Sequence, residues 1–343
     1  MIHVENLKKT EEEEWDKLVE SSPHATLFHK LDFLKPLAKH TKSELALLVG
    51  YKKEEKIGGL PIFIQKRSNL KMALSPPREM SIPYLGPILR DWNDLPQYRR
   101  EPNFHEFIEK ADEFLKTEFN PSYISISTPP NMDDARPFKW AGYEVEPMYN
   151  YLLDLRVGKG KLWEGLKKKL RQDITRTKKR GITVEEGGKK EFIYVYEQVA
   201  ERYAEQGKTP SLTKEFLLDV YKNFHPENLR VFVAKFEGQY AGGVIEVYFN
   251  DRAESWVGST KVNVSGVSPN DLIQWQTIEW AAEHGLKDYI IIGANTPRLS
   301  SYKLKFNPNP SIYFSAKKYS SAYVKLAEHG YKKILRPLKE KIR

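Results

Sequence analysis

The sequence predicts an α+β protein with mixed α/β-type sheets, arranged as two domains in tandem. The chain has 343 residues, which is too long for one ordinary domain and fits two. Both halves also repeat one order of elements: strands joined by a Gly-rich hairpin, a helix, and a strand followed by a short loop. We place the boundary after residue 156, so that the predicted domains span 1–156 and 157–343.

The first half is predicted to combine strands with one long helix. Two strands are expected at 44–52 and 58–66, because turn-forming residues separate two apolar runs. Apolar residues recur on one face of a helix at 104–119. Strands follow at 122–128 and 149–155, so this half contains all the parts of a small α+β domain.

The second half begins with a basic helix at 162–180, which Gly181 is suited to end. Short turns containing Gly238 and Asn250 separate three consecutive strands and indicate antiparallel pairing. The predicted elements after the basic helix are a strand at 182–187, helices at 191–206 and 213–224, strands at 229–236, 240–249 and 252–260, a helix at 270–284 and a strand at 288–292.

Composition excludes several classes of protein. Cysteine is absent, which rules out disulfides, zinc–thiolate sites and thiol catalysis. The eight histidines lack the spacing of metal ligands, so we expect no metal. No apolar run approaches the roughly 20 residues of a membrane span, and the N-terminus lacks a secretory pattern. We therefore expect a cytoplasmic protein.

Basic side chains are concentrated in two segments of a chain whose net charge is +9. The helix at 162–180 is either a docking surface for RNA phosphates or anionic headgroups, or a solvated helix face. The C-terminal segment 320–343 is either an amphipathic helix at the inner membrane face, or a terminal helix that packs its apolar side on the domain. Composition leaves both pairs of alternatives open.

The segment Ser268-Pro-Asn-Asp271 is a strong helix-start signal. Ser268 suits the cap position, Pro269 the first helical position, and Asp271 can reach back to the cap amide. The helix follows one strand and precedes a parallel one, so its free amides would face the mouth of the sheet. A phosphate or a developing oxyanion would be stabilised there. The alternative is a capped helix with no further role.

Six segments of the chain form an ordered set of motifs: GGLPIF (58–63), YLGPIL (84–89), RPFKWAGYEVEP (136–147), LRQDITRTKKRGITV (170–184), the segment 268–294, and YKLKF (302–306). Taken in this order, the motifs resemble the Fem family of tandem GNAT-fold acyltransferases, which is related to the FemAB-like or BioF2-like acetyltransferases. The resemblance spans nearly the whole chain, and the order of the motifs carries it.

This resemblance implies two GNAT-like acyltransferase domains that transfer an amino acid from aminoacyl-tRNA to an amine on a peptide or lipid-linked envelope precursor. It also implies that a lysine after an aromatic residue, here Lys303 after Tyr302, stabilises the transferred carbonyl. The loop 261–271 departs from the pyrophosphate-binding loop of CoA-dependent GNAT enzymes, because Gly266 is its only glycine. We expect no bound cofactor, with aminoacyl-tRNA or acyl-CoA as the donor substrate.

The candidate catalytic residues are Lys303, and Glu246 as a weaker candidate base. If the segment 302–306 is extended, Lys303 and Lys305 share one side. Each candidate also has a structural reading, as an exposed charge or a core residue. The candidate substrate-binding residues are Trp256, Ser268, Asn270, Tyr302 and Lys305.

Three functions therefore remain in view from the sequence. The first is transfer of an acyl or aminoacyl group to an amine on an envelope precursor. The second is acyl-CoA-dependent N-acetylation on the same fold. The third is a non-catalytic module, on a GNAT scaffold that has lost activity, which binds RNA or an anionic membrane surface.

Overall fold

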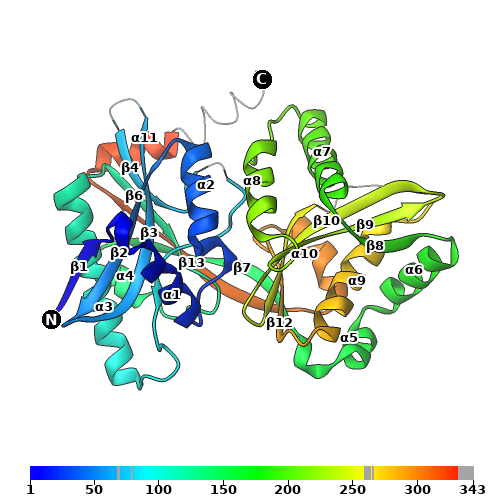
Figure 1. Ribbon diagram of the computed structural model, residues 1–343, viewed down its shortest axis with the longest axis horizontal. Coiled ribbons are helices and arrows are strands. Elements are labelled where there is room, and N and C mark those ends of the chain that lie inside the picture. Colours follow the sequence, from blue (N-terminus) through cyan, green and yellow to red (C-terminus); the bar gives the residue numbers. More distant parts are fainter. Residues whose placement is uncertain (68–69, 79, 259–263, 265, 331–343) are drawn as a thin grey trace. The chain divides into compact units, whose positions relative to one another are not determined.

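The computed structural model describes the chain except for residues 68–69, 79, 259–263, 265 and 331–343 (Figure 1). It divides into one unit of Met1–Met148 with the residues from Ile312 onward, and a second unit of Tyr149–Ser311. The predicted division into 1–156 and 157–343 differs at both ends of the second unit. The C-terminal residues join the first unit because strand β13 (Asn309–Tyr319) pairs with β6 (Tyr123–Ser127) of that unit.

The first unit is built on a sheet in the order β1-β2-β3-β4-β6-β13. The neighbours pair antiparallel except β4 and β6, which run parallel from Met72↔Tyr123 to Ser75↔Ile126. The short β5 (Ile88–Leu89) pairs with β3. The remaining strands are β1 (Ile2–Asn6), β2 (Glu44–Lys52), β3 (Glu55–Arg67) and β4 (Leu70–Ser75).

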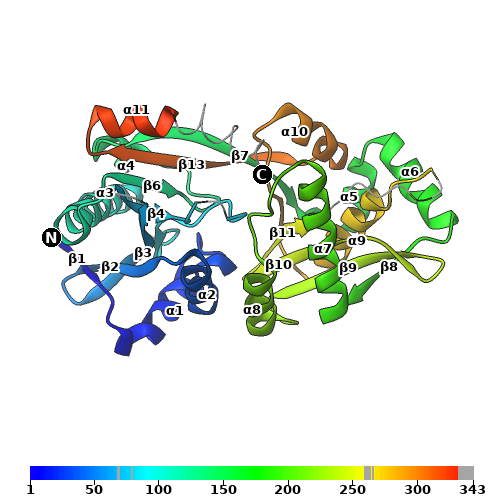
Figure 2. The same cartoon turned by 90° about the horizontal axis from the view of Figure 1, so that it is seen from above.

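Helices cover both faces of this sheet (Figure 2). Trp15 of α1 (Glu12–Ser21) packs over Gly59 of β3, and α2 (Leu31–Thr41) contacts β2. Phe107 of α3 (Gln97–Phe114) packs over Gly50, and α4 (Arg136–Trp140) contacts α3. Because Gly59 pairs with Val49, the neighbour of Gly50, the alternation of side chains directs the two glycines to opposite faces.

The second unit has a sheet in the order β7-β12-β11-β10-β9-β8. Only β11 and β12 run parallel, and the other neighbours are antiparallel. The predicted strands are confirmed to within a few residues, and residues 259–260 of the predicted strand 252–260 lie outside the described part. The strands are β7 (Glu144–Asp154), β8 (Thr183–Gly187), β9 (Leu229–Phe236), β10 (Gln239–Phe249), β11 (Arg252–Gly258) and β12 (Asp288–Ile291).

The helices of the second unit also lie on two faces (Figures 1 and 2). Helix α7 (Lys189–Glu205) packs Val195 over Gly243 of β10, and α8 (Lys214–Phe224) contacts α7. Apolar residues of α5 (Lys159–Gly165), α6 (Lys168–Lys179) and α9 (Pro269–Glu283) form one core with the opposite face. The α7, α8 and α9 helices match the predicted ranges to within two residues.

The single basic helix predicted at 162–180 is wrong in one respect, because the structure has two helices there. Leu166 adopts an extended conformation between α5 and α6. The Lys167 amide donates a hydrogen bond of 2.9 Å to the carbonyl of Lys305. This bond ties the break in the basic segment to the YKLKF motif itself.

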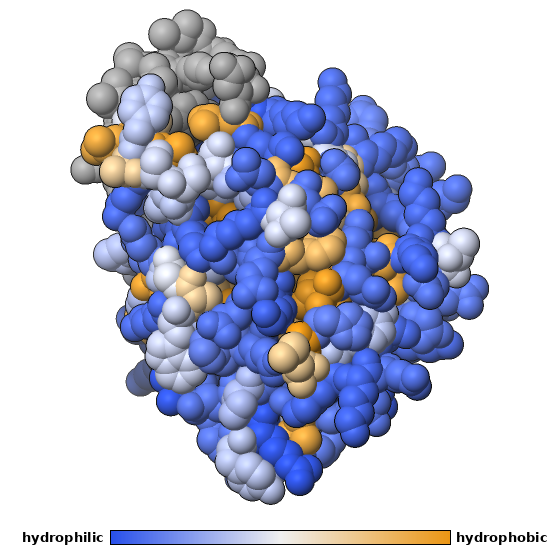
Figure 3. Space-filling view, turned by 90° about the vertical axis from the view of Figure 1, so that its left-hand side faces the viewer, coloured by the Kyte–Doolittle hydropathy of each residue, from blue (hydrophilic) through white to orange (hydrophobic). Residues whose placement is uncertain are grey.

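Helix α11 (Ala322–Gly330) is the described part of the basic C-terminal segment, and residues 331–343 lie outside the described residues. Val324 packs against Met72, Leu74 and Tyr123, whereas Tyr323 is 79% exposed. The face of the first unit in Figure 3 is mostly hydrophilic, with apolar residues in small separate patches. Among the described helices, none is both long and apolar enough to span a membrane.

Gly243 tests how tightly α7 packs on β10. A Cβ atom there would lie 2.5 Å from Val195 and 2.9 Å from the carbonyl of Phe232. We expect Gly243→Ala to destabilise the protein by roughly 2 kcal/mol, because this contact cannot relax without moving backbone. The measurement is urea unfolding followed by circular dichroism. The matched control is Gly160→Ala in α5, where a Cβ meets nothing within 4 Å and a gain of about 0.5–1 kcal/mol is expected.

Candidate functional site

The candidate site lies where the parallel strands β11 and β12 part. Their register runs from Arg252↔Asp288 to Ser255↔Ile291 and stops there, although β11 continues through Trp256 to Gly258. Beyond Ile291 the chain turns through Gly293, at φ 87°, into helix α10 (Pro297–Lys303). The divergence of these two strand ends leaves an opening at the C-terminal edge of the sheet, where ligands bind in α/β folds.

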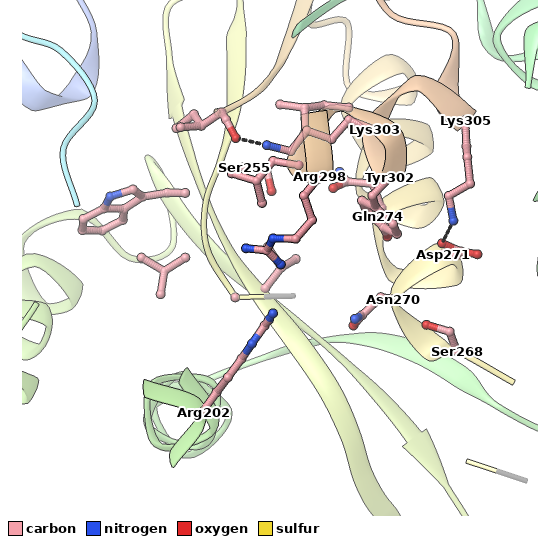
Figure 4. Close-up of a pocket in the computed structure, with 17 residues that line it drawn as sticks. Arg202, Ser255, Ser268, Asn270, Asp271, Gln274, Arg298, Tyr302, Lys303 and Lys305 are labelled. Atoms are coloured by element: carbon pink, nitrogen blue, oxygen red, sulfur yellow. Dashed lines mark hydrogen bonds and ion pairs between the residues drawn. The ribbon is translucent and has the colours of Figure 1, made fainter. Parts of the chain in front are cut away.

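A cavity of about 670 Å³ occupies this opening, and every residue that lines it belongs to the second unit. The α9 N-terminus forms one wall and α10 forms another (Figure 4). The polar lining residues are Arg202, Ser255, Ser268, Asn270, Asp271, Gln274, Arg298, Tyr302, Lys303 and Lys305. The apolar lining residues include Val244, Trp256, Val257, Ile291, Ile292 and Leu299.

The cavity brings together most of the residues that the sequence singled out. Every predicted substrate-binding residue lines it, and so does Lys303. Glu246 is fully buried in β10 and does not line the cavity. The residues selected from the sequence therefore line one cavity, except Glu246, which lies behind its wall.

Lys303, the last residue of α10, lines the opening. Its Nζ donates hydrogen bonds to the carbonyls of Ile292 and Gly293, immediately after the end of β12. Desolvation by burial lowers the pKa of Lys303 to about 8. Because an ammonium group has three N–H donors, one donor remains for a ligand in the cavity.

The loop that carries these carbonyls is anchored to β7. The Gly293 amide donates to Oδ1 of the buried Asn150 at 2.8 Å, and the Ala294 amide donates to the carbonyl of Tyr149 at 2.9 Å. These bonds fix the positions of the two carbonyls that Lys303 contacts. The ammonium position is therefore set by backbone on two neighbouring strands rather than by the lysine rotamer alone.

The segment 302–306 is not extended, so the condition under which Lys303 and Lys305 would share one side is not met. Residues up to Lys303 complete α10, and Leu304–Phe306 form a short 3-10 turn. A helical backbone separates successive side chains by about 100°, so the two lysines reach different partners. Lys305 pairs with Asp271 of α9 at 2.8 Å, and its Nζ lies 4.3 Å from the centre of the Tyr302 ring.

The predicted capping contacts at the α9 N-terminus are also wrong. The Ser268 side chain makes no cap hydrogen bond, and Asp271 is engaged with Lys305 instead of the cap amide. An ion pair with a cation outcompetes a neutral amide for a carboxylate. Within the described part of the chain, α9 therefore begins beside the cavity without a cap hydrogen bond from the Ser268 side chain.

Two arginines of the cavity were not predicted from the sequence. Arg202 projects from α7 and Arg298 from α10, and their guanidinium groups point toward one another in Figure 4. Arg298 makes no side-chain hydrogen bond or ion pair to the described part of the chain. The Thr296-Pro297 pair, which resembles a helix start, is the sequence signal that could have placed Arg298 and Lys303 on one helix.

A buried polar network lies under the cavity. The Tyr289 hydroxyl donates to Glu246 Oε1 at 2.9 Å and accepts from Nε2 of Gln274 at 2.6 Å. Oε2 of Glu246 has no hydrogen-bond partner among the described residues. Burial raises the pKa of the Glu246 carboxyl to about 8. Gln274 lines the cavity, so this network reaches from the cavity wall to the middle of the sheet.

The loop before α9 is described only in part, because residues 261–263 and 265 lie outside the described residues. Val264 and Val267 each donate their amide to the carbonyl of the other at 3.0 Å. These two amides are therefore not available to hold a pyrophosphate. Among the described residues, no group of three or more His, Asp or Glu side chains could hold a metal ion.

The buried Glu246 predicts a pH-dependent stability. Its folded pKa of about 8 exceeds the unfolded value of 4.5, so the stability it contributes is lost as pH rises from about 4.5 to about 8. Glutamine does not titrate. We expect the melting temperature of Glu246→Gln, relative to the parent protein, to rise by several degrees over this window and then level off. A constant difference from pH 5 to pH 9 would contradict the raised pKa.

Residues 165–304 match the family model described as an acetyltransferase (GNAT) domain. The matched segment contains Glu246, the α9 N-terminus and Lys303, and it lies within the second unit. No curated protein matches the chain.

Three solved structures share the fold of nearly the whole chain. The structure of FemX has a TM-score of 0.69 at 13% identity and covers 91% of this chain and 96% of its own. The C-terminal domain of a candidate lysylphosphatidylglycerol synthetase from Agrobacterium fabrum has a TM-score of 0.56 at 13% identity, covering 93% and 95%. A tandem GNAT protein from the clavulanic acid biosynthesis pathway has a TM-score of 0.52 at 10% identity, covering 94% and 99%. The Fem-like resemblance in the sequence is thereby confirmed at the level of the fold: residues 165–304 match a GNAT domain, and the chain shares the fold of FemX and tandem GNAT proteins.

Proposed function

We propose that this protein transfers an acyl or aminoacyl group to an amine on a peptide or lipid-linked envelope precursor, and that the reaction takes place beside Lys303. The observation that carries the proposal is the ammonium of Lys303, fixed on the carbonyls of Ile292 and Gly293 with one N–H remaining for the cavity. A charged donor in a partly buried site stabilises a developing oxyanion far more than it would in water.

The proposed reaction is an acyl substitution. The acceptor nitrogen attacks the donor carbonyl carbon, and the carbonyl oxygen becomes an oxyanion that accepts a hydrogen bond from Lys303. The attack forms the new C–N bond. The intermediate then collapses by breaking the C–O ester bond of the aminoacyl donor, and the leaving hydroxyl takes up a proton. The nitrogen of the acceptor amine also gives up one proton, because the amide formed carries one hydrogen fewer on that nitrogen.

Glu246 is proposed as the group that accepts this proton through Ser255. The two residues are cross-strand partners, and Ser255 lines the cavity whereas Glu246 lies behind it. The carboxyl does not touch a ligand directly, so it acts through the hydroxyl of Ser255. An acceptor that arrives as a free amine would need this relay less than one that arrives as an ammonium.

Three cationic or amide groups favour a donor that carries negative charge. Arg202 and Arg298 lie on the cavity wall, and the α9 amides near Ser268 and Asn270 begin beside it. Arginine recognises phosphate through paired N–H donors. The mutual hydrogen bonds of Val264 and Val267 oppose a pyrophosphate on this loop, so aminoacyl-tRNA is favoured over acyl-CoA as donor. FemX and the Agrobacterium protein, whose name refers to a lysylated lipid, share this fold.

Substitution of Lys303 tests the proposed oxyanion contact. We expect Lys303→Ala to lower kcat by about 100-fold or more, because the charged hydrogen bond to the oxyanion is lost. In the parent enzyme, kcat should pass through a maximum near pH 8, because Glu246 must lose its proton to act as the base and Lys303 must keep its proton to act as the donor. Lys303→Arg should remain charged above that pH and lose this alkaline limb. Lys287→Ala, a matched lysine on the surface of the second unit, is the control.

Unchanged transfer by Lys303→Ala would contradict the proposed role. If the parent protein shows no transfer with any donor but binds RNA or anionic vesicles in a salt-sensitive manner, the chain is a binding module instead.

The donor class is tested by calorimetry and by labelled transfer. We expect CoA to give no saturable heat, because the loop amides at Val264 and Val267 are occupied. A pool of tRNA charged with labelled amino acids should transfer label to a peptide bearing a lysine side chain. Saturable micromolar binding of CoA, with transfer from labelled acetyl-CoA, would establish the acyl-CoA alternative.

A further inference from the structure

A second cavity, of about 370 Å³, lies within the first unit. It is formed by the turn between β2 and β3, the residues after β5, and the N-terminal half of α3. Its apolar floor consists of Ile57, Leu89, Trp92 and Phe104, of which the last three are buried. All of these elements belong to the first unit, whereas the cavity beside Lys303 is lined by the second.

The rim of this cavity is strongly basic. Among its described lining residues, the cations are Lys52, Lys56, Arg90, Arg99 and Arg100, and the carboxylates are Glu55 and Asp91.

Some of these charges are already balanced. Lys56 pairs with Glu14 at 3.0 Å, and Arg90 pairs with Asp91 at 3.1 Å. Lys52 donates a hydrogen bond of 2.9 Å to the neutral side chain of Asn103. The charges that remain are Lys52, Arg99 and Arg100 against the single carboxylate of Glu55, so the net excess at the rim is positive.

Among these basic residues, Arg100 has a buried side-chain nitrogen, Nε, that lacks a hydrogen-bond acceptor within the described part of the chain. Its guanidinium lies 5.4 Å from the centre of the Trp92 ring. Within the same described part, neither Arg99 nor Arg100 forms a side-chain hydrogen bond or ion pair. A partly desolvated guanidinium group without a hydrogen-bond acceptor destabilises the folded protein, unless a bound anion supplies the acceptor. The contact with Trp92 holds the group in place while leaving its N–H donors unused.

We propose that this cavity binds a small ligand through a phosphoryl group, held by Arg99 and Arg100 and flanked by Lys52. The planar guanidinium fork matches phosphate oxygens in pairs, and the neighbouring lysine adds a point charge. The apolar floor takes the uncharged part of the ligand. The volume accommodates a phosphorylated small molecule and not a folded nucleic acid. The site is separate from the proposed transfer chemistry, and neither depends on the other.

Calorimetry with sodium pyrophosphate on the full chain tests the site. We expect saturable binding, together with a rise in melting temperature that grows with ligand concentration. Arg99→Gln and Arg100→Gln should each weaken binding by about tenfold, which corresponds to ~1.4 kcal/mol. Arg100→Lys should retain part of the affinity, because the charge remains and the fork is lost.

The control is Lys66→Gln, which removes one positive charge at the other end of β3, outside this cavity. Equal weakening by Lys66→Gln and Arg100→Gln would show that only overall charge matters and would overturn the proposal. Absence of saturable binding by the parent protein would also overturn it. Binding of a short RNA that pyrophosphate cannot displace would assign the basic rim to a nucleic-acid backbone instead.

Arg100→Gln could unfold the first unit, so Arg99→Gln, at an exposed position, keeps the test independent of folding. Circular dichroism melts of each variant without ligand establish that the fold is intact. Transfer activity is not a readout here. Failure of pyrophosphate binding therefore leaves the assignment of Lys303 untouched, and failure of transfer leaves this site untouched.

Discussion

The ammonium of Lys303 on the carbonyls of Ile292 and Gly293 is the interaction on which the candidate site depends. Parallel pairing of β11 and β12 ends at Ser255↔Ile291, and the carbonyls beyond that point have no strand partner in the ladder. Lys303 supplies the missing donors and at the same time points its charge into the opening. The same desolvation that lowers its pKa strengthens its interaction with a developing negative charge.

The surroundings of Lys303 divide into groups that face the cavity and groups that support it. Lys305 and Asp271 neutralise one another and join the 3-10 turn after α10 to α9, so they connect two walls of the cavity. Glu246, Tyr289 and Gln274 form a polar layer under the floor, where unsatisfied groups are costly and a network is therefore rigid. Arg202 and Arg298 remain directed into the open space. The cavity therefore combines a rigid buried polar network on one side with positively charged side chains at its opening. This combination suits a donor that carries an anionic group.

The two units have similar sheets, but their charged cavities lie at different places on those sheets. Each has one parallel strand pair within an otherwise antiparallel sheet, β4 with β6 in the first and β11 with β12 in the second. The large cavity lies at the parallel pair of the second unit, whereas the basic cavity of the first unit lies at a hairpin end beside α3. Fold repetition therefore does not imply repetition of the site, because ligand recognition depends on the side chains at each edge.

The sequence by itself determined the element types, their order, and the neighbourhood of the site. Hairpin turns and apolar periodicity act locally, so β9, β10 and α9 could be located without tertiary information. The motif order placed Lys303, Tyr302 and the α9 start together. Only the tertiary structure decided that 302–306 is helical and that Asp271 pairs with Lys305 rather than with the cap. It also decided that Glu246 lies behind the wall and that Arg202 and Arg298 line the same cavity. The same holds for β13, which leaves the second unit to pair with β6. Each of these outcomes depends on residues that are distant in sequence. Local sequence patterns do not indicate which of several possible distant residues forms the contact.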